Sequence, residues 1–222
     1  MDYQFDFGVV AQHGDELLLG ALKTLQLSAV AIALALALSL VLSLGLRSRY
    51  TVLHWPIVAF IEVVRNTPFL VQIFVLFFGL PVLGVRMSPT VTAMVALTLN
   101  GAAYVTEIIR GGLESINKGQ TEAGLALGLR PLQVFRFVIL KPALRAIYPS
   151  LVSQFIFLML TSSIVSSISA DELTHVAAVL EGRTFRSFEI YFAVAGLYLL
   201  MSALLSAAFA VIYRATLNYP SR

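Results

Sequence analysis

Residues 24–46, TLQLSAVAIALALALSLVLSLGL, decide the fold of this chain because they contain no charged residue. Small and large side chains alternate along the stretch, and a period of two is typical of a strand. The alternation does not separate polar from apolar residues, however, as a membrane-barrel strand requires. The length matches the roughly 20 residues with which a helix crosses about 30 Å of hydrocarbon. The stretch therefore predicts a transmembrane helix whose small residues allow close helix packing.

Uncharged stretches at 66–85, 87–106, 146–170 and 190–213 repeat this pattern along the chain. Hydrophobic residues make up 59% of the sequence and charged residues 12%, whereas soluble domains carry about 25% charged residues. We therefore expect an all-α integral membrane protein with one transmembrane domain over residues 1–222. Its five spans are predicted at about 17–46, 58–83, 88–110, 146–170 and 190–213.

Two other segments fit different roles. Residues 51–61 are uncharged but too short to span a bilayer, and with His54, Trp55 and Pro56 they predict an interfacial connector. The acidic start of the chain, MDYQFDFGVVAQHGDE, lacks the basic region of a secretory signal peptide, so 17–46 is predicted to be a span. The absence of cysteine excludes disulfides, thiolate metal sites and cysteine nucleophiles. No metal site is predicted.

The distribution of Lys and Arg predicts the orientation. With the N-terminus outside, eleven of the 15 basic residues, including Arg222, fall on the inside, and the outside holds Lys23, Arg86, Arg183 and Arg186. The positive-inside rule favours this N-out, C-in arrangement. The net charge of +3 is thus a topology signal, and no nucleic-acid partner is expected.

Residues 119–131, GQTEAGLALGLRP, lie in the predicted cytoplasmic loop between the third and fourth spans. Thr121 is suited to cap a helix, Gly128 to end it, and Pro131 to follow as a stop. The result is a helix of about two turns that exposes Ala123, Leu125, Ala126 and Leu127. Such a surface either docks into a partner protein or lies on the lipid headgroups.

The longer run EAGLALGLRPLQVFRFVILKPALRAIYPSL, residues 122–151, resembles the EAA loop of bacterial ABC-transporter permeases, here spanning 114–145. Glu122, Ala123 and Gly128 match the motif, Gly124 replaces its second alanine, and Lys141 occupies the proline position just before Pro142. The segment 63–81, VVRNTPFLVQIFVLFFGLP, resembles the second span of the polar amino-acid uptake branch, with Asn66 in place of a glycine. The resemblance extends from about residue 17 to residue 213.

This resemblance implies the type I ABC importer fold and a permease subunit of an ATP-driven, binding-protein-dependent amino-acid importer in the bacterial cytoplasmic (inner) membrane. Two permease chains, identical or homologous, would pair with two cytoplasmic ATP-binding subunits, and a periplasmic binding protein would deliver the amino acid. A coupling helix would fit a groove on the ATPase through Glu122, Ala123, Gly124, Leu127 and Gly128. The chain has no G-x-x-x-x-G-K-[ST] loop, so it is expected to be no enzyme, and ATP and Mg²⁺ would bind to the partner ATPase.

Polar residues within the predicted spans are candidates for contact with a translocated amino acid, because amides and hydroxyls serve both its carboxylate and its ammonium group. They are Gln72, Asn100, Tyr104, Gln154, Thr161 and Ser162, with Ser163 beside them. The alternative for each is a hydrogen bond between helices. Relatives commonly read K-D-T-S-L where this chain has LTSSI at 160–164. The missing acid favours a neutral or acidic amino acid as substrate.

The remaining charged groups are expected to be structural or solvated. Glu62 and Arg65, and likewise Glu107 and Arg110, have the i,i+3 spacing of helix ion pairs, with gating as the alternative. The external stretch 171–189, DELTHVAAVLEGRTFRSFE, has the mixed charge of a solvated loop, placed to contact a binding protein.

Other function classes fit less well. An intramembrane enzyme would need a Ser/His or Asp/Asp arrangement at membrane depth. A passive channel would have no use for a coupling helix.

Overall fold

The computed structural model describes residues 3–216, and every regular element in that range is a helix. Arg222 and both ends of the predicted 1–222 domain lie outside the described residues. Helices η1 and η3 are π-helical, and η2 and η4 are 3₁₀-helical. In chain order the elements are α1 Gly8–Gln12, α2 Gly14–Leu46, α3 Thr51–Arg65, α4 Phe69–Phe74, η1 Val75–Gly79, η2 Leu80–Leu83, α5 Pro89–Glu114, α6 Lys118–Ala126, α7 Pro131–Gln133, η3 Val134–Ile139, α8 Leu140–Thr161, η4 Ser162–Ile168, α9 Leu173–Thr184 and α10 Ser187–Thr216.

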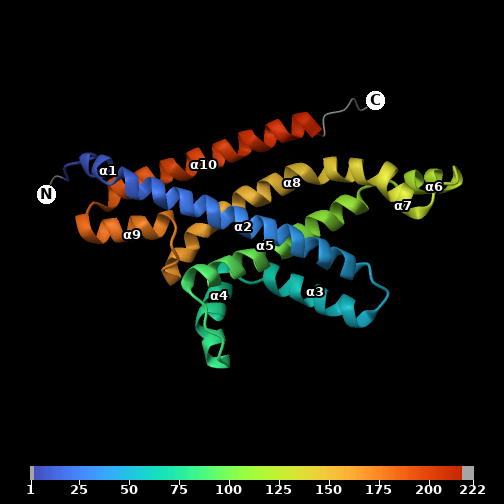
Figure 1. Cartoon of the computed structure of the whole chain (residues 1–222), viewed down its shortest axis with the longest axis horizontal. Coiled ribbons are helices and arrows are strands. Elements are labelled where there is room, and N and C mark those ends of the chain that lie inside the picture. The colour runs from blue at the N-terminus through green and yellow to red at the C-terminus, as the bar shows by residue number, and fades with distance from the viewer. Residues whose placement is uncertain (1–2, 217–222) are drawn as a thin grey trace.

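Helices α2, α5, α8 and α10 run lengthwise beside one another and form a bundle (Figure 1). The short helices α6 and α9 lie at opposite ends of it, which we call the coupling end and the α9 end. Within the described residues, four helical runs are long and apolar enough to cross a membrane, and they lie over four of the predicted spans. These runs are Gly14–Leu46, Pro89–Glu114, Pro131–Ile168 and Ser187–Thr216.

Small residues bring α2 and α5 close together. The buried positions of α2 recur every three or four residues, which is the spacing of one helix face and rules out the strand alternative for 24–46. They include Leu17, Gly20, Ala21, Thr24, Leu27, Ser28, Ala31, Ala35 and Ser39. On α5, a Cβ atom added at Gly101 would lie 3.0 Å from the Cβ of Ala35. Helix association through small residues is typical of membrane bundles.

The predicted span 58–83 contains a sharp bend that the sequence analysis did not indicate. Helix α3 ends at Arg65, and the segment from Phe69 to Leu83 leaves it at an angle of 112°. Pro68 causes the break, because proline lacks an N–H and disfavours a helical conformation at the preceding residue. The predicted connector 51–61 is also helical, since it forms most of α3, which packs against α2 and α5.

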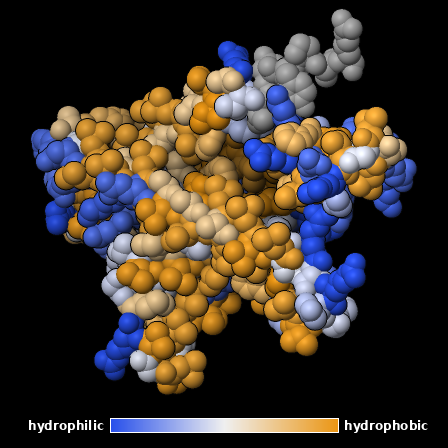
Figure 2. All heavy atoms as spheres, turned by 45° about the vertical axis from the view of Figure 1, so that its right-hand side comes forward, coloured by the Kyte–Doolittle hydropathy of each residue, from blue (hydrophilic) through white to orange (hydrophobic). Residues whose placement is uncertain are grey.

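The predicted outer loop 171–189 is mostly the helix α9, which lies against α2 and α10. It contributes to a hydrophobic cluster that joins the three helices and α8. Leu173 and Leu180 of α9 are fully buried there, beside Met159 and Ile190. Hydrophobic residues cover most of the face seen in Figure 2, and hydrophilic residues gather at the extremities. This distribution suits a bundle surrounded by lipid.

Candidate functional site

The predicted coupling helix exists as α6, but it begins earlier than the sequence indicated. Its cap is Asn117, whose side-chain oxygen accepts a 2.8 Å hydrogen bond from the N–H of Gly119. Residues 118–120 are therefore already helical, and Thr121 lies inside the helix rather than at its cap. Gly128 ends the helix as predicted, with a φ of 80° that glycine adopts without strain.

The end of α6 is fixed by a Schellman motif. The N–H of Gly128 donates to Leu125 O at 2.9 Å, and the N–H of Leu129 donates to Gly124 O at 3.2 Å. Pro131 then starts the next helix, and Gln133 closes its first turn by accepting from the N–H of Arg130 at 2.8 Å. The chain thus turns back on itself within a few residues.

Helix α6 packs on η3 through a single buried glycine. A Cβ atom at Gly124 would lie 3.0 Å from Cγ2 of Val134, so a side chain here would push the two elements apart. The other predicted coupling residues, Glu122, Ala123, Leu127 and Gly128, are exposed. We call residues 118–139 the coupling segment. Its large exposed apolar side chains are Leu125 (46% exposed), Leu127 (82%), Leu132 (76%) and Phe137 (67%).

Two predicted substrate residues, Gln72 and Asn100, bond to each other at the break between α3 and α4. The Nε2 atom of Gln72 donates to Val64 O at 2.7 Å and to Thr67 O at 3.1 Å, which are carbonyls left without helical partners at the break. Its Oε1 atom accepts from Asn100 Nδ2 on α5 at 3.1 Å. These contacts are the interhelical hydrogen bonds that the sequence left open as the alternative.

Charged side chains link α3 to α5 in a different way from the predicted one. Arg65 makes no ion pair with Glu62 but reaches Glu107 on α5, with a distance of 3.3 Å between Nη1 and Oε2. Its guanidinium also lies over the ring of the candidate Tyr104, 5.7 Å from the centroid. Asn66, at the break, donates to Glu62 at 2.9 Å in its place.

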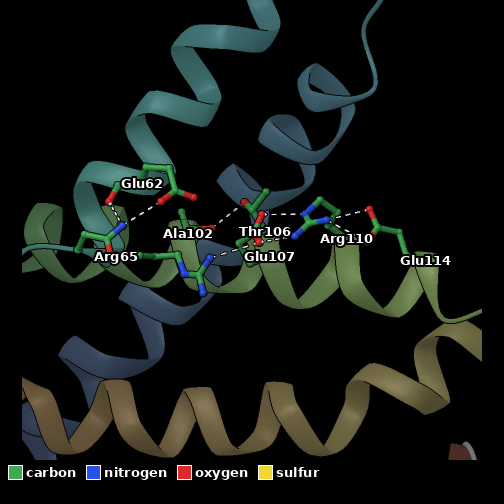
Figure 3. Close-up of polar contacts among 8 residues, drawn as sticks. Glu62, Arg65, Ala102, Thr106, Glu107, Arg110 and Glu114 are labelled. Carbon is green, nitrogen blue, oxygen red and sulfur yellow. Dashed lines mark hydrogen bonds and ion pairs between the residues drawn. The ribbon is translucent and has the colours of Figure 1, made fainter.

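The second predicted pair, Glu107 and Arg110, is present and is extended by Glu114. Arg110 donates to Glu107 at 2.8 and 3.0 Å and to Glu114 at 2.9 Å, so it lies between the two carboxylates along α5 (Figure 3). Together with Arg65, these side chains form a row of alternating charge from the α3 break toward the coupling segment.

The other substrate candidates lie along α8 and η4. The Nε2 atom of Gln154 is buried and has no hydrogen-bond partner among the described residues. Thr161 is the last residue of α8 and is 8% exposed. The Ser162 hydroxyl is fully buried and donates to Met159 O at 2.6 Å, and Ser163 similarly donates to Leu160 O. The Gln154 amide thus still has donor capacity for a ligand.

Two acids at the α9 end are fully buried, which corrects the prediction that 171–189 is a solvated loop. Glu172 caps α9 by accepting from the N–H groups of Thr174 (2.9 Å) and His175 (2.6 Å), and from the Tyr198 hydroxyl (2.8 Å). Burial raises the pKa of its carboxyl above the usual range, although these hydrogen bonds oppose the shift.

Glu189 is held in a similar way by the start of the chain. Its carboxylate accepts from the Tyr3 hydroxyl and from the N–H of Asp6, and it lies 3.5 Å from Arg186. Phe5 packs beside Phe188 on α10, with ring centroids 5.0 Å apart. Nothing in the mixed charge of 171–189 distinguishes these two buried acids from the exposed Asp171 or the half-buried Glu181. Glu172 and Glu189 differ in that each accepts a hydrogen bond from a tyrosine distant in sequence, Tyr198 and Tyr3 respectively.

A cavity at the coupling end lies apart from the substrate candidates. It has a volume of about 540 Å³ and opens between α2, α3 and the coupling-end half of α5. A second cavity of about 370 Å³ shares Arg47, Leu113 and Glu114 with it and reaches Thr121 in the coupling segment. Sequence reasoning did not indicate either cavity, because their walls come from three helices that are distant in sequence.

Comparison with known proteins finds relatives that match most of the chain. The family model for the binding-protein-dependent transport system inner membrane component matches residues 29–218. The glutamine transport system permease protein GlnP of Escherichia coli (strain K12) is 36% identical over 205 residues, which cover 91% of this chain and 94% of that protein. The probable glutamine ABC transporter permease protein GlnP of Bacillus subtilis (strain 168) is 38% identical over 164 residues, covering 72% of this chain and 75% of that protein.

Solved structures agree with these relatives. The crystal structure of an amino acid ABC transporter with histidines contains a chain that is 31% identical and matches with a TM-score of 0.90, over 96% of this chain and 100% of that one. An inward-facing structure of the MetNI methionine ABC transporter matches with a TM-score of 0.75 over 92% of this chain and 97% of that one. At 22% identity, the second match shows the fold alone.

Proposed function

Because this chain belongs to the family of binding-protein-dependent transport system inner membrane components and is an amino-acid ABC transporter permease, we propose that it forms one half of the translocation pathway of an ATP-driven importer. A second permease chain, identical or homologous, completes the pathway. Two ATP-binding subunits bind at the coupling end, and a binding protein delivers the amino acid at the α9 end. The assembly resides in the bacterial inner membrane with the N-terminus of this chain outside.

The exposed apolar surface of the coupling segment carries this proposal. Leu125, Leu127 and Phe137 face solvent on a compact element that is folded by its own caps and by Gly124. Contiguous apolar side chains on a water-facing helix mark a docking site for a protein. The ATPase is the partner that this family requires, since the chain has no phosphate-binding loop of its own. ATP and Mg²⁺ therefore bind in the ATPase.

The side chains along α8 support a neutral or acidic amino acid as substrate. The LTSSI stretch at 160–164 contains no acid. Two acids follow it in sequence. Asp171 is exposed and pairs with Lys23 at 3.3 Å, and Glu172 is fully buried and accepts three hydrogen bonds, so neither is free to bind a cationic side chain. Gln154 has a free N–H donor that suits a carboxylate or an amide oxygen. We propose Gln154 and Thr161 as substrate contacts, and glutamine is a substrate of the expected class.

Uptake into proteoliposomes tests the substrate class. The chain is reconstituted as the sole permease with its ATPase and binding protein, and uptake of glutamine, glutamate, arginine and lysine is compared. Glutamine or glutamate is expected to be transported at least tenfold faster than either cation. Gln154→Leu is expected to lower this uptake at least tenfold, whereas Gln26→Leu on the exposed face of α2 leaves it unchanged. Arginine or lysine as the best substrate would refute the assignment.

A matched pair of leucine substitutions tests the docking surface. Leu125→Ser removes an exposed leucine from the coupling segment, and Leu53→Ser removes one of similar exposure (46% against 52%) from α3. Co-purification with the ATPase should be lost in the first variant and retained in the second. Equal retention in both variants, or solute flux without any ATPase, would favour a passive channel instead.

A further inference from the structure

The cavity of about 540 Å³ at the coupling end has an amphipathic lining. One part of its wall is apolar and includes Leu46, Ile61 and Leu113. The other part is charged and draws on three different helices. None of the substrate candidates contributes to it. The cavity is therefore separate from the proposed translocation residues on α8 and η4.

The charges on the α5 side of this cavity satisfy one another. Arg110 binds Glu107 and Glu114 at once, and Glu107 also binds Arg65. Each charged side chain on this wall already has an oppositely charged partner, so the wall offers little attraction to a further ion. Any specific ligand must be held by groups from α2 and α3.

Three polar groups line the cavity on its α2 and α3 side: the exposed Arg47 and Glu62, and the hydroxyl of Ser43. Arg47 makes no ion pair or side-chain hydrogen bond within residues 3–216. Glu62 accepts a 2.9 Å hydrogen bond from Asn66 but pairs with no cation in the same part of the chain. The hydroxyl oxygen of Ser43 is buried without a partner. A cation, an anion and a hydroxyl thus line one space without bonding to one another.

We propose that this cavity binds a phospholipid whose headgroup carries both a phosphate and a primary ammonium group. Arg47 pairs with the phosphate, Glu62 accepts from the ammonium, and Ser43 donates to an ester oxygen. The apolar wall covers the first part of the acyl chains. Such a headgroup matches both unpaired charges, whereas a purely anionic headgroup would leave Glu62 without a partner.

The surroundings favour a lipid over a free amino acid as the zwitterion. The cavity is several times larger than an amino acid requires, and much of its wall is apolar. It lies where α2 ends and α3 begins, and the adjoining Trp55 is 63% exposed. Tryptophan is enriched at the water–membrane boundary, where headgroups lie.

Native mass spectrometry of the purified full chain tests the proposal with three lipids of matched acyl chains. Phosphatidylethanolamine is expected to be retained about tenfold more than phosphatidylcholine, whose trimethylammonium donates no hydrogen bond, and more than phosphatidylglycerol. Glu62→Gln should abolish the preference for phosphatidylethanolamine. Arg47→Gln should lower retention of all three lipids. The control Arg49→Gln, in the same turn but outside the cavity lining, should change nothing.

A second variant tests the site by volume instead of charge. Ser43→Phe leaves both charges in place and fills the cavity, so it should also reduce retention of phosphatidylethanolamine, with folding checked by circular dichroism. Equal retention of the three lipids, or a preference that survives Glu62→Gln, would overturn the proposal. Displacement of the lipid by millimolar free glutamine would also overturn it, because the cavity would then be an amino-acid site.

Discussion

The two ends of this helical bundle differ in how their acidic side chains are placed, although both expose large apolar side chains. At the coupling end, Leu127 and Phe137 are 82% and 67% exposed, whereas at the α9 end Glu172 and Glu189 are fully buried. The contacts to these two carboxylates come from the chain itself, but within residues 3–216 nothing covers Leu127 and Phe137 at the coupling end. The two buried carboxylates of the α9 end are thus satisfied within one chain, whereas we propose that a partner covers Leu127 and Phe137 at the coupling end.

The largest effect is expected from deleting most of α6 at the coupling end. Deletion of residues 121–128 should abolish ATP-driven uptake in proteoliposomes, because the ATPase loses its docking helix. The bundle should remain folded, with a melting temperature close to that of the unaltered chain, since α6 contributes only Gly124 to the buried residues. Retained ATP-driven transport after this deletion would contradict the division between the two ends.

The next effect concerns the stability of the buried end. Glu172→Ala should lower the free energy of unfolding by about 3 kcal/mol, because it leaves two backbone N–H groups and the Tyr198 hydroxyl without an acceptor. Denaturant unfolding in detergent, followed by circular dichroism, measures the change. Glu181→Ala on the same helix is the control, and its loss should stay below about 1 kcal/mol because its hydrogen bonds to Ser187 and Tyr191 are exposed.

A smaller effect follows from the raised pKa of Glu172. When burial raises the pKa of a carboxyl in the folded state, stability is fully present below the unfolded value and is lost as pH rises through the folded value. Glu172→Gln removes this ionisation, so the variant should gain stability relative to the unaltered chain as pH rises above the ordinary titration range of a carboxyl. Melting temperatures of both proteins across that range measure the difference. A difference in melting temperature that does not change with pH would contradict a raised pKa for Glu172.

The smallest effect tests whether burial or charge determines how much an acid at the α9 end contributes to stability. Asp171 is the neighbour of Glu172, but its side chain is 59% exposed and pairs with Lys23 at 3.3 Å. Asp171→Asn should change the free energy of unfolding by less than about 0.5 kcal/mol, because exposed ion pairs contribute little. The same unfolding assay measures it at low and high salt. A loss comparable with that of Glu172→Ala would show that charge, and not burial, governs this end.

Sequence reasoning predicts the features that depend on nearby residues. The stretch 24–46 forms a helix because length and composition allow no other structure in a membrane, and its small residues do pack closely against α5. Gly128 ends α6 because a left-handed turn requires a residue without a Cβ atom. The break at Pro68 had a local signal as well, since proline disfavours a helical residue before it, but the long uncharged stretch concealed it.

Features that depend on distant residues could not be predicted in this way. Glu172 and Asp171 are adjacent acids, yet one is buried because Tyr198 lies beside it and the other is not. Arg65 pairs with Glu107, 42 positions away, instead of with Glu62 on its own helix. Gln72 and Asn100 have the polarity of substrate contacts but bond to each other across two helices. In each case the folded arrangement selects the partner.

One continuous helical run, from Pro131 to Ile168, connects the two regions compared above. Near its start, Val134 supports α6, and near its far end lie Thr161 and Ser162. For the proposed transporter, thermodynamic linkage then applies to that run: the factor by which a bound amino acid changes the affinity for the ATPase equals the factor by which the ATPase changes the affinity for the amino acid. If this helix transmits the effect of a bound amino acid to the ATPase site, it must transmit the effect of the bound ATPase to the amino-acid site with the same coupling free energy.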